Sequence, residues 1–295
     1  MIYCLGNTNY DIVFNAESFS TATPGGSKLN TAVSLGRLKQ PVSFISRVGK
    51  DILGSRIEGF LKKNRVATTH FLLDKHIKTN LALAFLDDEK NASYVHYGSE
   101  KTAFPPPEVD FSGSDYLLFG SMFAVAKPTD LLTEEIVKRA IKSKSLIIYD
   151  PNMRKKCSSS QHSYKQAVLK RMHQSHIIKL SDEDLEALGM KPQDLKAIMG
   201  GKYLIVTQRD KEVLFFSDKV NLQVTTEQIT PLSTIGAGDG FNAGLISALY
   251  NRKVKAGQLH ELSAEEWREV IASGNRVAAG VCKQKENYIS QYMEL

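Results

Sequence analysis

The amino-acid sequence predicts an α/β fold in which a mainly parallel central sheet is flanked by helices on both faces. Short β-rich runs recur along the chain, and stretches of helical periodicity lie between many of them, which is typical of strand–helix–strand units. Strands are expected at residues 2–5, 42–46, 81–86, 116–119, 146–149, 176–179, 203–206 and 213–216, and helices at 28–38, 56–63, 132–142, 164–174 and 182–188. Ligands of such sheets bind beyond the carboxyl ends of the strands.

The elements follow from their residue types in chain order. Residues 2–5 (Ile-Tyr-Cys-Leu) form an apolar run, and the first helix follows a pair of glycines. Residues 81–86 and 94–97 are joined by a polar turn at 87–91, which is typical of a hairpin, although an edge of the main sheet is the alternative. Another long helical pattern begins near Asp239, where small and apolar residues recur with helical spacing.

The bulk composition favours a globular protein and excludes several classes. The 295 residues, 42% hydrophobic and 24% charged, suit one large α/β domain over residues 1–295, although two small ones would also fit the length. No transmembrane helix is expected. The first residues already form a strand-like run, so we expect a cytoplasmic protein. The net charge of +6 is spread along the chain without an aromatic platform, so we expect no nucleic-acid partner. Neither cysteine nor histidine spacing predicts a zinc site.

The stretch from Ser233 to Gly244 is the strongest candidate for chemistry. Gly236, Ala237 and Gly238 carry almost no side chain, and a helix begins near Asp239. A helix start presents unpaired N–H groups to an anion such as a phosphate, and a carboxylate there can accept a proton from an attacking hydroxyl. An ordinary capped helix is the alternative. The spacing differs from a Walker A loop and from a dinucleotide fingerprint.

Two motifs resemble the signatures of the ribokinase/PfkB-type carbohydrate kinases. Gly236-Ala-Gly-Asp239 followed by Phe-Asn-Ala-Gly244 resembles the C-terminal signature, and Gly25-Gly-Ser-Lys-Leu-Asn30 with Gly49-Lys-Asp51 resembles the N-terminal one. The resemblance implies a ribokinase-like fold with a small β lid near residues 12–24 and 79–100. It also implies a sugar as substrate, with ATP and Mg²⁺ as cofactors.

The resemblance assigns roles to individual residues. Asp239 is expected to be the catalytic base, with the backbone of Gly236, Ala237 and Gly238 as an anion hole; the helix terminus is expected to keep Asp239 ionised and a weak base. The expected sugar ligands are Asn9, Asp11, Gly25, Gly26, Asn30 and Arg154. The expected nucleotide ligands are Lys179, Ser181, Thr207, Arg209, Thr234, Gly236, Gly238, Asn275 and Ala279, and Asp184 is expected in the outer shell of the magnesium ion.

Each of these segments also has a structural alternative. Residues 6–11 and 150–154 can be plain turns. Ser181 and Asp184 fit a capping box, which is compatible with a nucleotide role. Asn275 and Ala279 can belong to a small-residue helix face. Lys28 stands where the fructokinase-like branch prefers proline; it could reach an acidic substituent of the substrate or point to solvent, and we favour solvent.

Several departures from the family pattern leave the substrate open. Arg209 and Glu212 replace glycines of a nucleotide loop, and Ser233 replaces an aspartate, which argues against activation by a monovalent cation. Residues 150–154 favour fructose or a keto-deoxy sugar acid. A ribose or nucleoside kinase is the alternative enzyme, and a sugar- or nucleotide-binding protein with weak catalysis is the alternative from another class. The exposed edge of the hairpin would allow a homodimer.

Overall fold

The first strand lies at the centre of the fold and is buried on both faces. The structure, a computed structural model, describes residues 1–15, 18–86, 92–98, 104–153, 161–208 and 212–293. In β1 (Ile2–Leu5), Ile2 and Cys4 contact one hydrophobic core, whereas Tyr3 and Leu5 contact a second core on the other face. Because successive side chains of a strand point to opposite faces, a strand of this kind requires helices on both sides of its sheet.

The central sheet has ten strands and is mainly parallel, as predicted. Its order is β14-β13-β12-β11-β10-β9-β1-β4-β5, with β6 also paired to β4, and only β13 and β14 run antiparallel to their neighbours. The strands are β4 (Val42–Gly49), β5 (Val66–Ala67), β6 (Phe71–Asp74), β9 (Tyr116–Gly120), β10 (Leu146–Asp150), β11 (Ile177–Ser181), β12 (Tyr203–Thr207), β13 (Glu212–Phe216) and β14 (Asn221–Thr225). The chain leaves β1 towards β4 on one side and returns through β9 on the other, so the strand order reverses at β1. Such a reversal opens a crevice at the carboxyl ends of the strands.

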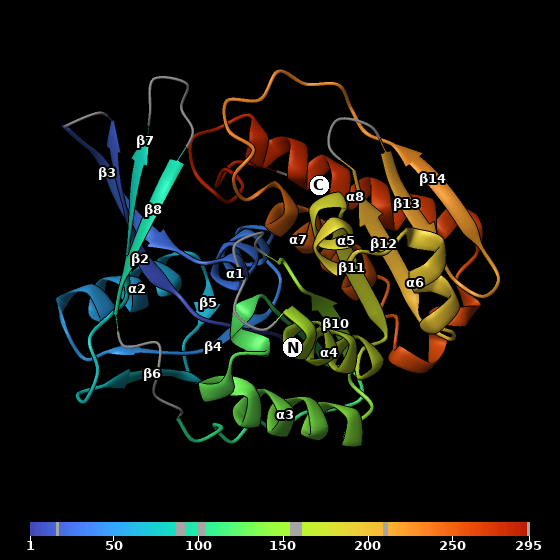
Figure 1. Ribbon diagram of the computed structural model, residues 1–295, viewed down its shortest axis with the longest axis horizontal. Coiled ribbons are helices and arrows are strands. Elements are labelled where there is room, and N and C mark those ends of the chain that lie inside the picture. The colour runs from blue at the N-terminus through green and yellow to red at the C-terminus, as the bar shows by residue number, and fades with distance from the viewer. Residues whose placement is uncertain (16–17, 87–91, 99–103, 154–160, 209–211, 294–295) are drawn as a thin grey trace.

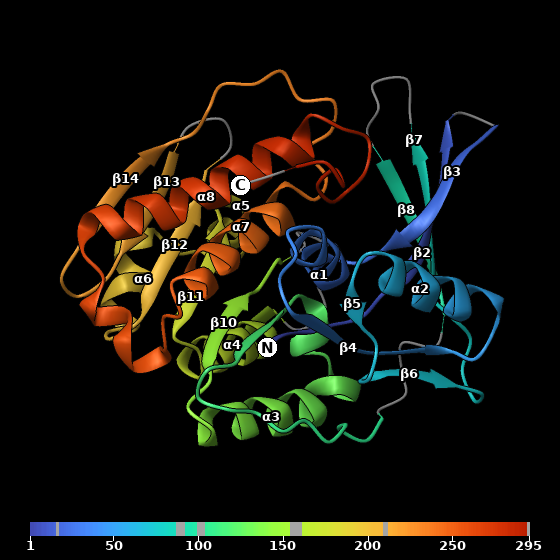
Figure 2. The same cartoon turned by 180° about the vertical axis from the view of Figure 1, so that it is seen from behind.

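Helices cover both faces of this sheet. The first core is closed by α1 (Ser27–Arg37), α2 (Ile52–Lys63), α7 (Ala237–Asn251) and α8 (Ala264–Cys282). The second core is closed by α3 (Lys127–Lys142), α4 (Gln161–His173), α5 (Asp182–Leu188) and α6 (Pro192–Ile198). Figures 1 and 2 show these two layers from opposite sides. Two short 3₁₀ helices, η1 (Met122–Ala124) and η2 (Ala256–Glu261), complete the chain. In the part of the chain that the structure describes, no helix combines the length and apolarity that crossing a bilayer requires.

A separate four-stranded sheet forms the lid. Its order is β3-β2-β7-β8, with β2 (Asn9–Asn15), β3 (Ser18–Gly25), β7 (Leu81–Leu86) and β8 (Ala92–Tyr97). The hairpin prediction is confirmed, because β7 and β8 pair antiparallel from Leu81 opposite Tyr97, although its turn at 87–91 lies outside the described residues. The strands belong to their own sheet and not to the main one. In Figure 1 this sheet projects beside α2, away from the central strands.

The position of α7 depends on close contact with α8. A methyl group placed on Gly244 of α7 would lie 2.3 Å from the carbonyl oxygen of Ser273 on α8. In the other direction, a methyl group on Gly274 would lie 2.7 Å from the ring of Phe241. The Ser273 hydroxyl also donates a hydrogen bond to the Gly244 carbonyl over 3.1 Å. The two backbones therefore touch, and this contact fixes the axis of the helix that carries Asp239.

We predict that Gly244→Ala destabilises the protein even though alanine is the better helix former. The added methyl group forces α7 away from α8, and overpacking of this kind costs about 1–3 kcal/mol of unfolding free energy. Gly59→Ala in α2 is the matched control, since nothing lies within 4 Å of its added methyl group. The control should gain up to about 1 kcal/mol from helix propensity. Urea denaturation measures both, and equal stability of the two variants would contradict the close contact.

Candidate active site

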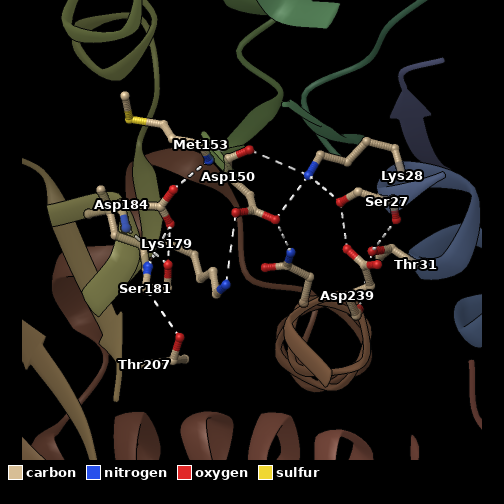
Figure 3. A network of polar contacts seen from close by, with 12 residues as sticks. Ser27, Lys28, Thr31, Asp150, Met153, Lys179, Ser181, Asp184, Thr207 and Asp239 are labelled. Carbon is tan, nitrogen blue, oxygen red and sulfur yellow. Dashed lines mark hydrogen bonds and ion pairs between the residues drawn. The ribbon is translucent and has the colours of Figure 1, made fainter. Parts of the chain in front are cut away.

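Asp239 lies buried in the first turn of α7, facing the first turn of α1. Ser27 Oγ donates to its Oδ1 over 2.5 Å, and Asn30 Nδ2 donates to its Oδ2 over 2.9 Å. Thr31 Oγ1 donates to its backbone carbonyl over 3.1 Å (Figure 3). All three donors come from α1, so the N-terminal signature holds the carboxylate of the C-terminal signature in one orientation.

The electrostatic setting of Asp239 differs from the expectation. Burial raises the pKa of this carboxyl, and the nearby Lys28 ammonium together with the hydrogen bonds from Ser27 and Asn30 opposes the rise without cancelling it. The expectation of a weak base took only the helix terminus into account. The pKa of Asp239 is raised instead, because the side chain is removed from water. A raised pKa suits a group that must accept a proton.

A second buried carboxylate, Asp150 at the end of β10, lies between two ammonium groups. Lys28 Nζ and Asn242 Nδ2 contact its Oδ2 at 2.9 and 2.7 Å, and Lys179 Nζ lies 3.8 Å from its Oδ1. Burial acts to raise the pKa of Asp150, but Lys179, Lys28 and the hydrogen bonds outweigh it, so the pKa lies below its ordinary value. Asp150 is therefore an ionised residue that holds two cations inside the protein.

The expectation that Lys28 faces solvent is wrong. Its side chain is 1% exposed and forms the ion pair with Asp150. Two glycines leave room for it: a methyl group on Gly6 would lie 2.9 Å from Lys28 Cβ, and one on Gly120 would lie 3.1 Å from Lys28 Cε. The buried ammonium is tolerated because it is paired and hydrogen-bonded.

A cavity of about 390 Å³ lies beyond the ends of β10, β11 and β12, against the start of α7. Every expected nucleotide or catalytic residue that the structure describes lines it: Lys179, Ser181, Asp184, Thr207, Thr234, Gly236, Ala237, Gly238, Asp239, Asn275 and Ala279. Arg209 lies outside the described residues. The sequence therefore anticipated which distant segments meet here.

The first turn of α7 presents donors to this cavity. Gly236 has φ +84°, and a methyl group on it would lie 2.2 Å from the carbonyl oxygen of Asn287, so only glycine fits. The Ala237 N–H donates to the Thr234 carbonyl, and the first bond within the helix runs from Gly240 N to Gly236 O. Helix geometry thus leaves the N–H groups of Gly238 and Asp239 to a ligand.

A cation adds to this arrangement. A methyl group on Gly238 would lie 3.1 Å from Lys179 Nζ, so the ammonium lies directly beside the turn. Helix N–H groups with an adjacent ammonium form a site for an anion such as a phosphate.

Asp184 forms the predicted capping box. Its Oδ2 accepts from the backbone N–H and the hydroxyl of Ser181 at 2.7 and 2.8 Å, and its Oδ1 accepts from Met153 N at 2.6 Å. Burial, and then the charge of Asp150, raises its pKa. Glu183 lines the cavity beside it. Within the described ranges, no group of three or more His, Cys, Asp or Glu could hold a metal ion. The carboxylates of Asp184 and Glu183 fit a magnesium ion that keeps its own water and phosphate ligands.

A second cavity, of about 360 Å³, lies between the lid and the central sheet. Among the expected sugar ligands, Asn9 and Gly26 line it. Asp11 is not part of its wall, because its carboxylate accepts a hydrogen bond from Asn9 and packs against Gly25. Asn30 is bound to Asp239 instead. Arg154 lies outside the described residues.

Several residues of this second cavity were missed. They are polar or basic and come from the lid, β4, the start of α1 and the loops after the strands: Asn7, Ser27, Arg47, Lys78, Asn80, His96, Ser121 and Asn152. Ser27 belongs to the N-terminal signature and was within reach of sequence analysis, whereas Arg47 and Lys78 belong to no motif. Asn152 lines both cavities, and Ser27, in the wall of the second, donates to Asp239, in the wall of the first. The two cavities therefore adjoin at Asn152, and the hydrogen bond from Ser27 to Asp239 links their walls.

Comparison with known proteins agrees with this geometry. Residues 1–291 match the model of the pfkB family of carbohydrate kinases. The chain belongs to this family. A carbohydrate kinase is a phosphotransferase that acts on a sugar hydroxyl. A fructokinase from Vibrio alginolyticus is 27% identical over 256 residues, which cover 84% of this chain and 83% of that protein.

Solved structures show the same fold. A fructokinase from Vibrio cholerae O395 bound to fructose, ADP and calcium has a TM-score of 0.85 at 20% identity, over 98% of this chain and 95% of that one. An aminoimidazole riboside kinase from Salmonella enterica, complexed with aminoimidazole riboside and an ATP analog, has a TM-score of 0.82 at 21% identity, over 96% and 94%. The fold is therefore ribokinase-like, as the resemblance implied.

We predict that Asp150→Asn destabilises the protein in a pH-dependent way. At neutral pH the variant leaves Lys28 and Lys179 without their carboxylate, which costs about 3–5 kcal/mol. Because the pKa of Asp150 is lowered by folding, its stabilisation is complete above about pH 4 and is lost as the pH falls further. Denaturation at several pH values should show the deficit shrinking in acid. Exposed Asp110→Asn is the control, with little change expected. A deficit that stays constant down to pH 3 would contradict the ionised state of Asp150.

Proposed function

We propose that this protein is an ATP-dependent sugar kinase that transfers the γ-phosphoryl group of ATP to a primary hydroxyl of a ketose or keto sugar acid. The hydrogen bond from Ser27, in the wall of the second cavity, to Asp239, in the wall of the first, carries this proposal. The first cavity offers helix N–H groups and Lys179 to a triphosphate, and the second offers amide, hydroxyl and basic side chains under a lid. The fructokinase relatives support a sugar as acceptor.

In the proposed reaction, the acceptor hydroxyl lies beside Asp239 and attacks the γ-phosphorus in line, while the bond from the γ-phosphorus to the bridging oxygen of ATP breaks and ADP leaves. Asp239 accepts the hydroxyl proton, and Ser27 and Asn30 hold its two oxygens so that the carboxylate keeps one orientation. The N–H groups of Gly238 and Asp239, with the Lys179 ammonium, stabilise the charge on the transferring group. The lid limits the access of water, which competes for the phosphoryl group.

A magnesium ion bound to the nucleotide would neutralise phosphate charge, and Asp184 with Glu183 would hold it through water. The capping box that fixes Asp184 at the start of α5 would keep its carboxylate in place for this contact.

The wall of the second cavity bears on the acceptor class. Arg47, Lys78 and His96 are basic, and none of the described residues that line this cavity carries a carboxylate. Arg47 is held by Asp74 over 3.1 Å and stacks on Phe104, so its guanidinium is fixed in the wall. Asn9 and similar amides suit sugar hydroxyls. A carboxylate on the sugar would add an ion pair with Arg47, which favours the sugar acid of the two acceptors.

Two alternative functions are less well supported than a sugar kinase. The riboside kinase with a similar fold keeps a ribose or nucleoside acceptor as the alternative enzyme. A binding protein without catalysis is opposed by the complete set of hydrogen bonds around Asp239.

We predict that Asp239→Asn lowers turnover by about 100- to 10,000-fold, because general-base catalysis is worth that much. Affinity for Mg-ATP should remain within a few-fold, since the N–H groups and Lys179 are unchanged. ADP release and nucleotide titration measure the two quantities, with Asp110→Asn as control. Normal turnover in Asp239→Asn would remove Asp239 from the mechanism.

We predict that ADP release is fastest with a keto sugar acid in a panel that also contains fructose, ribose and adenosine. Arg47→Met should raise KM for the acid by about 10- to 100-fold, the worth of a charge-assisted hydrogen bond, and leave KM for fructose nearly unchanged. Arg47→Lys keeps the charge and should restore part of the loss. Equal effects of Arg47→Met on both acceptors would contradict the role of the basic wall.

A further inference from the structure

Lys28 makes three polar contacts, and together they use every proton of its ammonium group. Nζ lies 2.9 Å from Asp150 Oδ2, 3.4 Å from the Asp150 carbonyl oxygen and 3.1 Å from Ser27 Oγ. An ammonium group has three donors and no acceptor, so each contact must be a donation from Lys28. The side chain is fully buried, so these contacts are not shared with bulk water.

This saturation orients the next hydrogen bond. Because Ser27 Oγ accepts a hydrogen bond from Lys28, its own single proton is directed to Asp239 Oδ1, 2.5 Å away. The contacts therefore form a directed series from Lys28 through Ser27 to Asp239 (Figure 3). Ser27 also lines the second cavity, so an unoriented hydroxyl there would have other partners available when an acceptor binds.

We propose that Lys28 is a positioning residue for catalysis: it fixes the Ser27 hydroxyl as a donor to Asp239 and supplies the positive charge that keeps the Asp239 carboxylate ionised until the acceptor binds. This inference rests on the proposed role of Asp239 as the base. Lys28 acts through Ser27 and is not itself in the wall of either cavity.

The charges around Asp239 show why such a residue is needed. Asp239 is buried, and the charge of Asp150 on β10 disfavours a second negative charge nearby. Lys28 from α1 opposes this effect, whereas Lys179 from β11 is placed beside the turn at Gly238. Lys28 is the cation connected to the base itself. Without Lys28, only the neutral donors Ser27 and Asn30 would stabilise the buried Asp239 carboxylate against the charge of Asp150.

The fold around Lys28 is shaped for a long side chain. A methyl group on Gly6, which follows β1, would lie 2.9 Å from Lys28 Cβ, and one on Gly120, which ends β9, would lie 3.1 Å from Lys28 Cε. The two glycines thus leave the space that this side chain fills.

The test measures the titration of Asp239 directly and through catalysis. Lys28→Met keeps the length of the side chain and removes its charge. The full-length protein labelled with carbon-13 aspartate reports the carboxyl titration by NMR, and Asp239→Asn identifies the resonance. Lys28→Met should raise the pH at which Asp239 titrates by about one to three units, since the loss of a nearby opposite charge has that effect. The acid limb of kcat/KM should move by the same amount, and raising the pH should recover most of the turnover.

Two further variants separate this role from a structural one. Lys28→Met/Asp150→Asn removes both charges of the buried pair, so it keeps the test open if the single variant does not fold. Ser27→Ala should lower turnover, and adding Lys28→Met to it should cause little further loss, because both changes break the same series of contacts. Full additivity of the two changes would overturn the proposed route through Ser27.

The outcomes distinguish this inference from the proposed function. An unchanged titration of Asp239 in Lys28→Met, with turnover reduced at every pH, would overturn the inference and leave Lys28 with a structural role. A shifted titration in a protein that phosphorylates no acceptor would uphold the link between Lys28 and Asp239 while refuting the kinase reaction.

Discussion

The ion pairs of Asp150 are the interaction on which the geometry of the site depends. This one carboxylate, at the end of β10, contacts Lys28 of α1, Asn242 of α7 and Lys179 of β11. These partners come from widely separated parts of the chain. An ion buried without its partner is costly, so few arrangements of these elements satisfy all the charges at once. The two family signatures are brought together around a buried charge that belongs to neither of them.

Close contacts at two glycines also help to fix the geometry of the site. The α7–α8 contact at Gly244 sets the axis of α7, and the left-handed conformation of Gly236 sets where that helix begins. Together they point the free N–H groups of the first turn into the first cavity. Ser27, Asn30 and Thr31 then fix Asp239 in the wall of the first cavity. The geometry of the candidate site results from close backbone contacts as much as from its polar side chains.

Much of the fold and of the first cavity could be predicted from the sequence. The expected central strands are all present, because strands buried on both faces have a strong apolar signal. The residues expected to bind nucleotide, where the structure describes them, line one cavity, because the glycine motif and the strand ends mark them locally. Strands β2 and β3 were recognised only through the family resemblance, since their residues mix apolar and polar types without clear alternation.

The rest depends on contacts that a local pattern cannot reveal. The predicted position of Lys28 was wrong because lysine is normally exposed, and its partner Asp150 lies 122 residues further along the chain. The predicted direction of the Asp239 pKa shift was wrong because its carboxylate is buried against α1, which its own helix does not reveal. Arg47 and Lys78 line the second cavity from β4 and from the segment before β7, and they belong to no motif.

A crystal structure of the protein with an acceptor sugar and a non-hydrolysable ATP analogue would test the central claim most directly. The triphosphate is expected in the first cavity against the start of α7 and the sugar in the second, with a primary hydroxyl within hydrogen-bonding distance of Asp239 and in line with the γ-phosphorus. A sugar hydroxyl in line with the phosphate but in contact with a different base, or a sugar bound outside the second cavity, would contradict it.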